Sequence, residues 1–433
     1  MKNYLIMALC LILSLGGVAC TSTVESYVSD PVAVADDDDS QKRAERMADL
    51  DYLCSNLAVS HPDMYRNTTS EAIERKRQEI ISKMEGLDDF SFAIELQTLV
   101  AMLGDSHTTI SVNQMVDENI RMLPIRLKAF GNRWVLSTVP TESEHILGYE
   151  LLALNGHPMP EVHAALAPFF SSDNEVKLDR QFVSSFYVVP ILQHFGIMDD
   201  ESSIPLVVSS SEGETTTVII PVIAAKDTQS YGFSSLSRLR MAVPETEWDR
   251  TRNYKALPIG DALYIQYNVC RQDKDIPMDE FVLQLRRMME AGNYGKIIID
   301  LRNNGGGSDG VLRPVLEWLP ECMAAGKEVY TLIGETTFSS AVINGVMLQM
   351  IGSTLVGTPS SGNVDHFGAT DAFVLPNLPL QVRYSTKYMD LGEYFGAEDR
   401  YGDSPLMPDV VVGQTLSDYL AGIDTAVEYV LDL

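Results

Sequence analysis

Lys296-Ile-Ile-Ile-Asp-Leu301, followed at once by Arg302-Asn-Asn-Gly-Gly-Gly307, is the most informative stretch of this chain. The first half is short, continuously apolar and rich in β-branched residues, which predicts a strand buried on both faces of a parallel sheet. Three successive glycines predict a turn whose backbone takes a positive φ or approaches another group closely. Helix-spaced apolar residues from Val311 to Leu319 predict a helix directly after this turn.

A second strand–turn–helix unit follows the first. Glu328 to Ile333 predicts a strand, Gly334 to Phe338 a turn, and Ser339-Ser-Ala341 the start of an apolar helix that ends near Ile351. Two such units in tandem predict an α/β fold with a parallel sheet, whose ligands bind at the carboxyl ends of the strands. One turn offers bare backbone N–H groups and the other a serine at a helix N-terminus. These are the parts of an oxyanion hole and a nucleophile.

The motifs of the two turns resemble those of a known enzyme family. Asp300-Leu-Arg-Asn-Asn-Gly-Gly-Gly307, Thr337-Phe-Ser-Ser-Ala341 and Leu355-Val-Gly357 are similar to the catalytic core of the tail-specific (C-terminal processing) and tricorn-type serine peptidases. The resemblance implies a crotonase/ClpP-like parallel-sheet core. It also implies a serine endopeptidase that hydrolyses protein or peptide substrates through an acyl-enzyme, with no cofactor and no metal.

The resemblance further implies roles for individual residues in these turns. The family motif places the reactive serine directly after the aromatic residue, so Ser339 rather than Ser340 is the expected nucleophile. The backbone N–H groups of Ser340 and Gly306 would hold the oxyanion. Losing one such donor typically costs about 10²–10³ in rate.

A serine hydroxyl needs a base within hydrogen-bond reach. The family uses either a lysine shortly after the serine or a distant histidine, and no Lys or Arg occurs between Ala341 and Val382. In the tricorn-type branch the histidine follows N-terminal helices, in a segment that Leu103-Gly-Asp-Ser-His-Thr-Thr-Ile110 resembles. His107 is therefore the expected base, with Ser106 bonded to it or to the oxyanion. His366 is the alternative base or a substrate contact.

A carboxylate is expected to orient the base. Asp403 is the first candidate and Glu398 the second, both in the tail of the chain. The family often carries a glutamate three residues past the serine, where this chain has Val342. This departure leaves open a peptide-binding lipoprotein of the same fold that has lost turnover. A hydrolase of small esters or amides is another alternative, since crotonase-like sheets host many chemistries.

Two further domains are expected before the catalytic one. Residues 42–115 carry helical periodicity, interrupted at His61-Pro62, which predicts an N-terminal helical domain with the Asp-Ser-His-Thr segment at its end. Residues 116–225 alternate short strands with turns and resemble a PDZ-like domain, although the usual Gly-Leu-Gly-Phe loop is missing, so the domain is expected to be degenerate. The peptidase domain is expected over 226–433, where Lys226 to Asn253 predicts a linker or lid.

The first 41 residues predict export. Residues 1–19 have the basic start and apolar stretch of a secretory signal peptide. Gly17-Val-Ala-Cys20 resembles the lipobox of bacterial lipoprotein signals, which implies lipidation at Cys20. The protein is then expected in the bacterial cell envelope, anchored by lipid in the outer membrane and facing the periplasm or the surface. Residues 20–41, with four successive aspartates, predict a disordered acidic tether.

Composition excludes other classes of partner. Lys plus Arg number 32 against 60 Asp plus Glu, for a net charge of −28. Nucleic-acid binding is disfavoured because it needs a basic face. Anionic membrane surfaces are disfavoured for the same reason, so the lipid would be the only membrane contact. Cys54, Cys270 and Cys322 lack metal-ligand spacing and are expected as buried free thiols.

Overall fold

The computed structural model describes residues 37–433 of the chain. The expected signal peptide, Cys20 and most of the expected tether lie outside the described residues. The end of the tether was predicted to be disordered, but helix α2 already begins at Asp37, so residues 37–41 are helical. Within the described part of the chain, no helix combines the length and apolar character needed to cross a bilayer.

A six-stranded sheet forms the core of the C-terminal half. Its strand order is β11-β12-β13-β14-β15-β18, in which β11 is antiparallel to β12 and the other neighbours are parallel. The two tandem units predicted from sequence supply β13 and β14 and the helices that follow them. The strands are β11 (Tyr254–Ile259), β12 (Ala262–Tyr267), β13 (Lys296–Asp300), β14 (Glu328–Ile333), β15 (Thr354–Gly357) and β18 (Val410–Val411).

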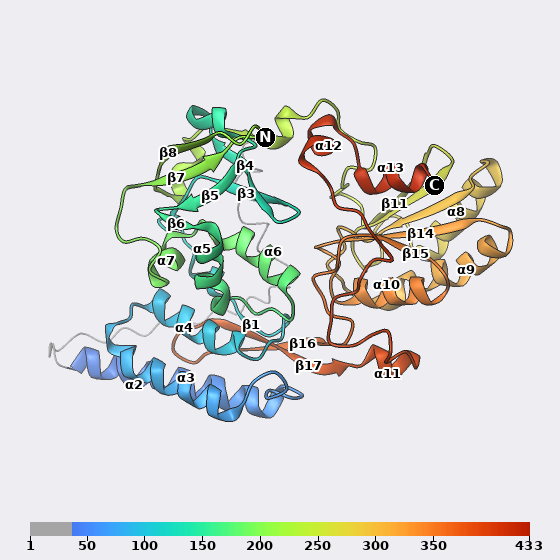
Figure 1. Ribbon diagram of the computed structural model, residues 1–433. Helices are drawn as coiled ribbons and strands as arrows, with labels where there is room; N and C mark the ends of the chain where they lie inside the picture. Colours follow the sequence, from blue (N-terminus) through green and yellow to red (C-terminus); the bar gives the residue numbers. More distant parts are fainter. Residues whose placement is uncertain (1–36) are drawn as a thin grey trace.

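Helices cover both faces of this sheet (Figure 1). Ile297 and Ile299 of β13 pack toward α8 (Met278–Ala291), α9 (Arg313–Ala324) and α10 (Ser340–Met350), whereas Ile298 packs toward α13 (Thr425–Leu431). Successive side chains of a strand point to opposite faces, so a continuously apolar run is required here. Helix α12 (Leu416–Ala421) precedes α13.

The second sheet is antiparallel and has seven strands. Five of them follow the order β10-β4-β5-β7-β8, while β3 pairs with β4 and β6 pairs with β5. Strands β7 and β8 form a hairpin around Gly213, which has φ +84°. Strand β10 lies in the stretch predicted as a linker, so the sheet continues past residue 225. The strands are β3 (Arg126–Phe130), β4 (Arg133–Pro140), β5 (Glu150–Leu154), β6 (His157–Pro158), β7 (Ser203–Ser209), β8 (Thr215–Pro221) and β10 (Phe233–Ser235).

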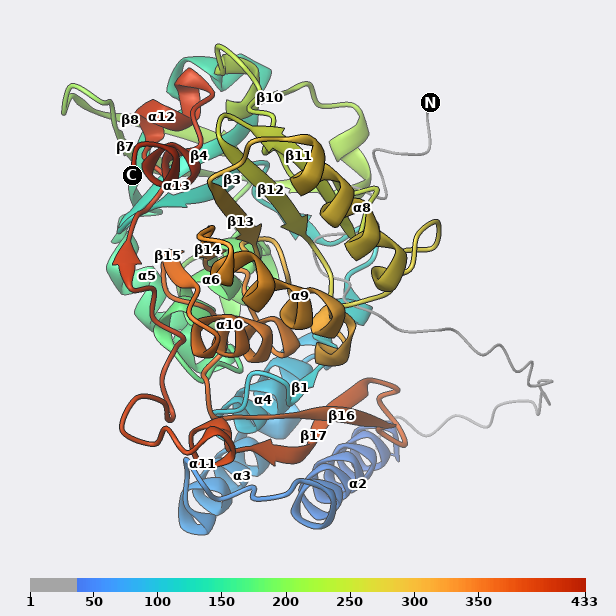
Figure 2. The ribbon, with the colours of Figure 1, turned by 90° about the vertical axis from the view of Figure 1, so that its right-hand side faces the viewer.

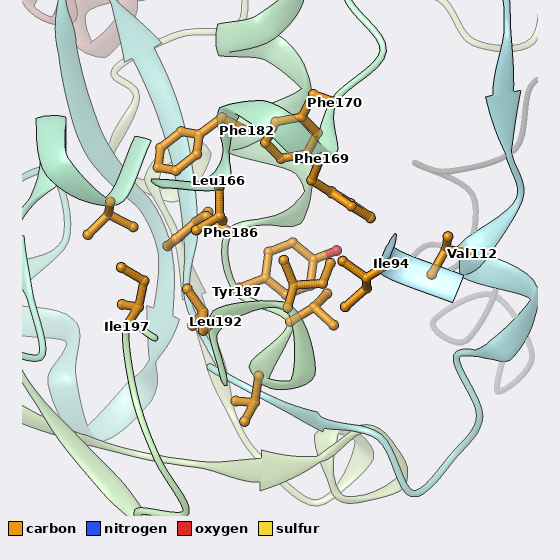
Figure 3. Close-up of a cluster of buried hydrophobic side chains, with 14 of the residues drawn as sticks. Ile94, Val112, Leu166, Phe169, Phe170, Phe182, Phe186, Tyr187, Leu192 and Ile197 are labelled. Atoms are coloured by element: carbon orange, nitrogen blue, oxygen red, sulfur yellow. The ribbon is translucent and has the colours of Figure 1, made fainter. Parts of the chain in front are cut away.

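Three helices cover this sheet: α5 (Met159–Leu166), α6 (Glu175–Ser185) and α7 (Val189–His194). Pro190 lies in the first turn of α7, where its missing N–H leaves no hydrogen bond unmade, so α6 and α7 are separate helices. The apolar side chains of these helices share a core with the N-terminal helix that carries Ile94 (Figure 3). The sheet and the N-terminal helices therefore do not have separate cores.

The N-terminal helices are α2 (Asp37–Ser60), α3 (Ser70–Lys83) and α4 (Asp89–Ala101), with the predicted break after α2. A long hairpin from the C-terminal half, β16 (His366–Val374) and β17 (Gln381–Met389), lies along them (Figure 2). Strand β1 (Thr109–Ile110) pairs with β17 and completes a three-stranded sheet. The hairpin, although it belongs to the C-terminal half of the sequence, thus pairs with Thr109–Ile110, which begins two residues after His107.

The remaining elements are short. They comprise β2 (Arg121–Met122), β9 (Ile223–Ala224), α11 (Leu391–Phe395) and the 3-10 helices Met84–Gly86, Val112–Met115, Thr141–Ile146, Ala167–Phe169, Ala225–Gln229, Leu236–Leu239 and Asp309–Leu312.

Candidate active site

Ser339 occupies a strained turn at the N-terminus of α10. Its φ of 52° and ψ of −128° lie in a region that residues with a Cβ rarely adopt. The neighbouring glycine turn presses against it: a Cβ added at Gly306 would lie 2.9 Å from the Cβ of Ser339. Gly306 itself has φ +104°. The two turns predicted from sequence therefore pack directly on each other, and the glycine is required by the approach of the serine.

The backbone donors beside Ser339 differ from those expected. The N–H of Gly306 donates to Oδ1 of Asn304 at 2.9 Å, so this group is already occupied. The carbonyl of Gly307 accepts from Oγ of Ser340 at 2.8 Å. In the described part of the chain, the N–H groups of Ser340 and Gly307 have no recorded acceptor. Of the two expected donors, Ser340 thus has an unpaired N–H within the described residues, whereas Gly306 does not.

The structure brings His107 to the serine turn. Its imidazole stacks on the ring of Phe338, the residue before Ser339, with centroids 4.5 Å apart and planes 22° apart. The imidazole of His366 stacks on His107 at 5.7 Å. Both ring nitrogens of His107 are buried, and neither has a hydrogen-bond partner among the described residues. The imidazole is thus beside the serine turn without being bonded to Ser339.

Asp105 is the carboxylate next to His107. Its Oδ1 accepts the backbone N–H of His107 at 2.8 Å and lies 3.8 Å from Nδ1 of the ring. Its Oδ2 lies 3.1 Å from Nε2 of His61 and accepts from Oγ of Ser385 at 2.6 Å and from Thr108. Burial alone would raise the pKa of Asp105, but these bonds and the nearby His107 hold it below its usual range. A buried, ionised carboxylate with several donors is a fixed partner for an imidazole.

The electrostatic environment keeps His107 neutral. Burial is the largest cause and lowers the pKa of His107 well below its ordinary value, while Asp105 opposes this effect. The cations Lys177 and Arg383 and the neighbouring ring of His366 lower it further. A neutral imidazole has a lone pair with which it can accept a proton.

The other predicted site residues have different partners. Ser106 donates to Oδ1 of Asp173 at 2.5 Å rather than to His107. Asp403 accepts from Arg66 at 3.1 Å and from Tyr388 at 2.6 Å, and no described residue links it to His107. Among the described residues, Ser106 therefore lacks the expected bond to His107, and Asp403 is not the carboxylate beside the imidazole.

Glu398, the second candidate acid, is exposed to solvent. The sequence did contain a signal for the actual neighbour, Asp105. An Asp two residues before the histidine forms a turn in which its carboxylate accepts the later N–H.

His366 is buried and lines a cavity of about 230 Å³ that Arg66 and Asp403 also line. Its Nδ1 lies 2.9 Å from the carbonyl oxygen of Val364, so this nitrogen carries the proton when the ring is neutral. Nε2 then has a free lone pair. His366 therefore lines this cavity and is chemically able to act as a base.

One residue of the site had no signal in the sequence. Lys177, on α6, places Nζ 3.7 Å from the centroid of the Phe338 ring. Within residues 37–433, no group of three or more His, Cys, Asp and Glu side chains is arranged to hold a metal ion. Cys54, Cys270 and Cys322 are free thiols, and Cys54 is only partly buried.

No protein-family model matches this chain, and no curated protein matches it either. Solved structures do match. Mature CPAF complexed with lactacystin has a TM-score of 0.61 and 15% identity, covering 90% of this chain and 97% of that one. Mature CPAF alone has a TM-score of 0.60 and 15% identity, covering 90% and 96%. This likeness establishes that the chain has the α/β fold of CPAF.

A photosystem II D1 C-terminal processing protease also matches, with a TM-score of 0.42 and 12% identity, over 90% of this chain and 97% of that one.

Proposed function

We propose that this chain is a serine endopeptidase of the tail-specific and tricorn-type family, which hydrolyses peptide bonds in protein or peptide substrates. Its six-stranded sheet would be the crotonase/ClpP-like core and its seven-stranded sheet a degenerate PDZ-like domain. One observation carries the proposal. Ser339 sits on a strained turn at a helix N-terminus, against a glycine turn, with the imidazole of His107 stacked on the adjacent Phe338.

In this proposal, Oγ of Ser339 attacks the substrate carbonyl. The negative charge that develops on the carbonyl oxygen is stabilised by the N–H groups of Ser340 and Gly307, which have no recorded acceptor in the described part of the chain. His107 accepts the serine proton and returns it to the leaving amine, and water then hydrolyses the acyl-enzyme. Asp105, which holds the backbone of the histidine, stabilises the imidazolium that forms.

The unbonded imidazole of His107 is compatible with this mechanism. Catalytic hydrogen bonds are often long or absent without substrate and form in the complex. In this mechanism the imidazole leaves the ring of Phe338 when substrate binds, and a ring nitrogen then bonds to Ser339. His366 is the second candidate base, because its Nδ1 contact with the carbonyl of Val364 leaves Nε2 free to accept a proton.

The same observation favours one alternative. If His107 stays on Phe338 and His366 does not act in its place, the serine has no base, and the chain would bind peptides without cleaving them. The alternative and the main proposal share the fold and differ only in whether Ser339 becomes reactive.

Reaction with a fluorophosphonate probe distinguishes the two. We expect the full-length mature protein to be labelled, the Ser339→Ala variant to be unlabelled, and a control Ser211→Ala, in an exposed turn, to react normally. His107→Gln should slow labelling and peptide cleavage by about 10²-fold or more if it is the base, and His366→Gln should have the smaller effect. Labelling that persists in Ser339→Ala would refute the assignment of the nucleophile. An unlabelled parent protein that still binds peptides would support the alternative.

We also propose that Cys20 is lipidated and holds the enzyme in the bacterial cell envelope. This part rests on the sequence of residues 1–41 alone. Incorporation of labelled palmitate in cells should be lost in Cys20→Ser, and the variant should move from the membrane fraction to the soluble fraction. Equal incorporation in both proteins would contradict it.

A further inference from the structure

Lys177 is a buried cation that forms no ion pair with the described residues. It belongs to α6, a helix between the seven-stranded sheet and α10 (Figure 1), and the residue is only 9% exposed. Its ammonium lies over the face of the Phe338 ring, with Nζ 3.7 Å from the ring centroid. Among the described residues, no carboxylate forms an ion pair with it. Lysines are rarely buried to this extent unless they are paired, because burial of an unpaired charge is unfavourable.

The nearest carboxyl groups are engaged elsewhere. Asp173 accepts a hydrogen bond from Ser106, and burial raises its pKa above the usual range, which weakens it as a counter-ion. Asp105 accepts from His61 and Ser385. Both acids affect Lys177 only through space. Despite the net charge of −28, no described carboxylate thus forms a direct ion pair with this ammonium, which lies on the ring next to the proposed nucleophile.

A second cation lies one turn further along the same helix. Arg180 is three residues after Lys177, a spacing that puts both side chains on one face of α6. Glu335, in the turn before Phe338, acts on Arg180 through space, and no ion pair between them is present in the described part of the chain. Burial lowers the pKa of both cations, that of Lys177 to about 8.

The helix that carries these cations is fixed to the serine turn. Asn174, which caps α6, donates to the carbonyl of Ser361 at 3.2 Å and to Oδ1 of Asn363 at 2.9 Å. Gly362, between these two residues, packs so closely that an added Cβ would lie 3.2 Å from the backbone nitrogen of Ser339. The ammonium is therefore held in place at the site.

We infer that Lys177, assisted by Arg180, binds a carboxylate of the peptide substrate beside Ser339 and so gives the enzyme a preference for substrates with a negative charge near the scissile bond. The inference rests on the proposed peptidase function. The carboxylate could be an acidic side chain or the C-terminal carboxylate of the peptide, since both present the same group. In the free enzyme, the ring of Phe338 holds the ammonium through a cation–π contact, which a carboxylate replaces at binding.

Matched peptide substrates test this preference. One pair of fluorogenic peptides differs by Glu or Gln at each position in turn, and another by a free or an amidated C-terminus. We expect the parent enzyme to favour the carboxylate member of one pair by about tenfold or more in kcat/KM, mostly through KM. The ratio should fall to about one in Lys177→Met, which keeps the apolar stem, and should persist in Lys177→Arg. An exposed control, Lys274→Met, should leave it unchanged.

The pH dependence is a second readout. The groups that act on the ammonium of Lys177 are Arg180, Asp173 and Asp105. Substrate carboxylates stay ionised across the neutral and alkaline range, so the preference should decline as pH rises through about 8, where the free Lys177 loses its proton. A merely structural lysine would change activity without this pH-dependent change in substrate preference.

Binding to an inactive variant separates this inference from the proposed function. In a Ser339→Ala background, fluorescence anisotropy gives the Kd of each labelled peptide without any turnover. Failure of cleavage with a retained carboxylate preference in Kd would refute the peptidase and keep the carboxylate site. Cleavage without any preference, or a preference that survives Lys177→Met in a protein with an unchanged melting temperature, would refute the carboxylate site.

Discussion

The serine turn and the histidine segment are held in place by different forces. Ser339 is positioned by its own backbone, which is strained at φ 52° and packed on a glycine turn only some thirty residues earlier. His107 is positioned by partners far along the chain, such as Ser385, whose hydroxyl donates to Asp105, and β17, which pairs with β1. The nucleophile is thus pre-organised within one domain core, whereas the base is delivered by docking of a hairpin. Substitutions at the serine turn and at the histidine segment should therefore change activity and stability by different amounts.

The largest expected effect comes from filling the space between the two turns. In Gly306→Ala, the added methyl group would lie 2.9 Å from Cβ of Ser339 and 3.0 Å from the carbonyl oxygen of Phe338, at a φ of +104°. Activity should fall about 10²-fold or more, because the nucleophile is displaced, and stability should fall by about 2 kcal/mol. Fluorophosphonate labelling rates and thermal melting measure the two effects.

Gly310→Ala is the matched control. Nothing lies within 4 Å of a Cβ added there. It should be close to neutral in both measurements. Equal losses in the two variants would show that the serine turn does not depend on the close approach of Gly306.

Substitutions around His107 should have smaller effects on activity than Gly306→Ala. Ser385→Ala removes the 2.6 Å bond to Asp105 and leaves a buried carboxylate with one donor fewer. We expect a loss of about 1–3 kcal/mol in stability and about tenfold in kcat, because the orientation of His107 loosens. Lys387→Ala, exposed on the same strand, is the control and should change neither. If Ser385→Ala left the rate unaffected, Asp105 would not orient the base.

The serine turn could be predicted from the sequence because it is held by local structure, whereas the contacts of the histidine segment could not, because they come from distant parts of the chain. The strands and helices on either side of the two turns came from local patterns, because an apolar β-branched run, three glycines and a serine at a helix start each fix their own neighbourhood. The position of His107 was expected through the family resemblance. The bonds of Asp105 were not, because two of its donors lie in distant segments, as Ser385 does in β17. Lys177 was missed because nothing in a helical pattern shows which face meets another domain.

Acid should weaken the histidine segment in a defined window. The folded-state pKa of His107 is lowered by burial, so between about pH 6.5 and this lower value the unfolded chain binds a proton that the folded chain does not. Stability therefore falls as pH decreases below about 6.5, by up to about 1.4 kcal/mol per pH unit for this one group. In His107→Gln the decrease between pH 7 and 5 should be smaller, as measured by denaturant unfolding. The exposed His145→Gln should behave like the parent, and identical pH curves for all three would exclude His107 as the acid-sensitive group.

The smallest effect isolates the strain at Ser339 from its chemistry. Ser339→Ala and Ser339→Gly both remove the hydroxyl, so neither should be labelled or cleave peptides. Alanine keeps a Cβ at φ 52°, whereas glycine adopts this region without steric cost. The glycine variant should therefore be more stable than the alanine variant by about 1 kcal/mol. Elsewhere glycine usually makes a protein less stable than alanine does, because it raises the conformational entropy of the unfolded chain. Urea unfolding of the two inactive proteins measures the difference directly. An alanine variant of equal or greater stability would mean that the serine turn is not strained, and the nucleophile would then be held by packing alone, as the base is.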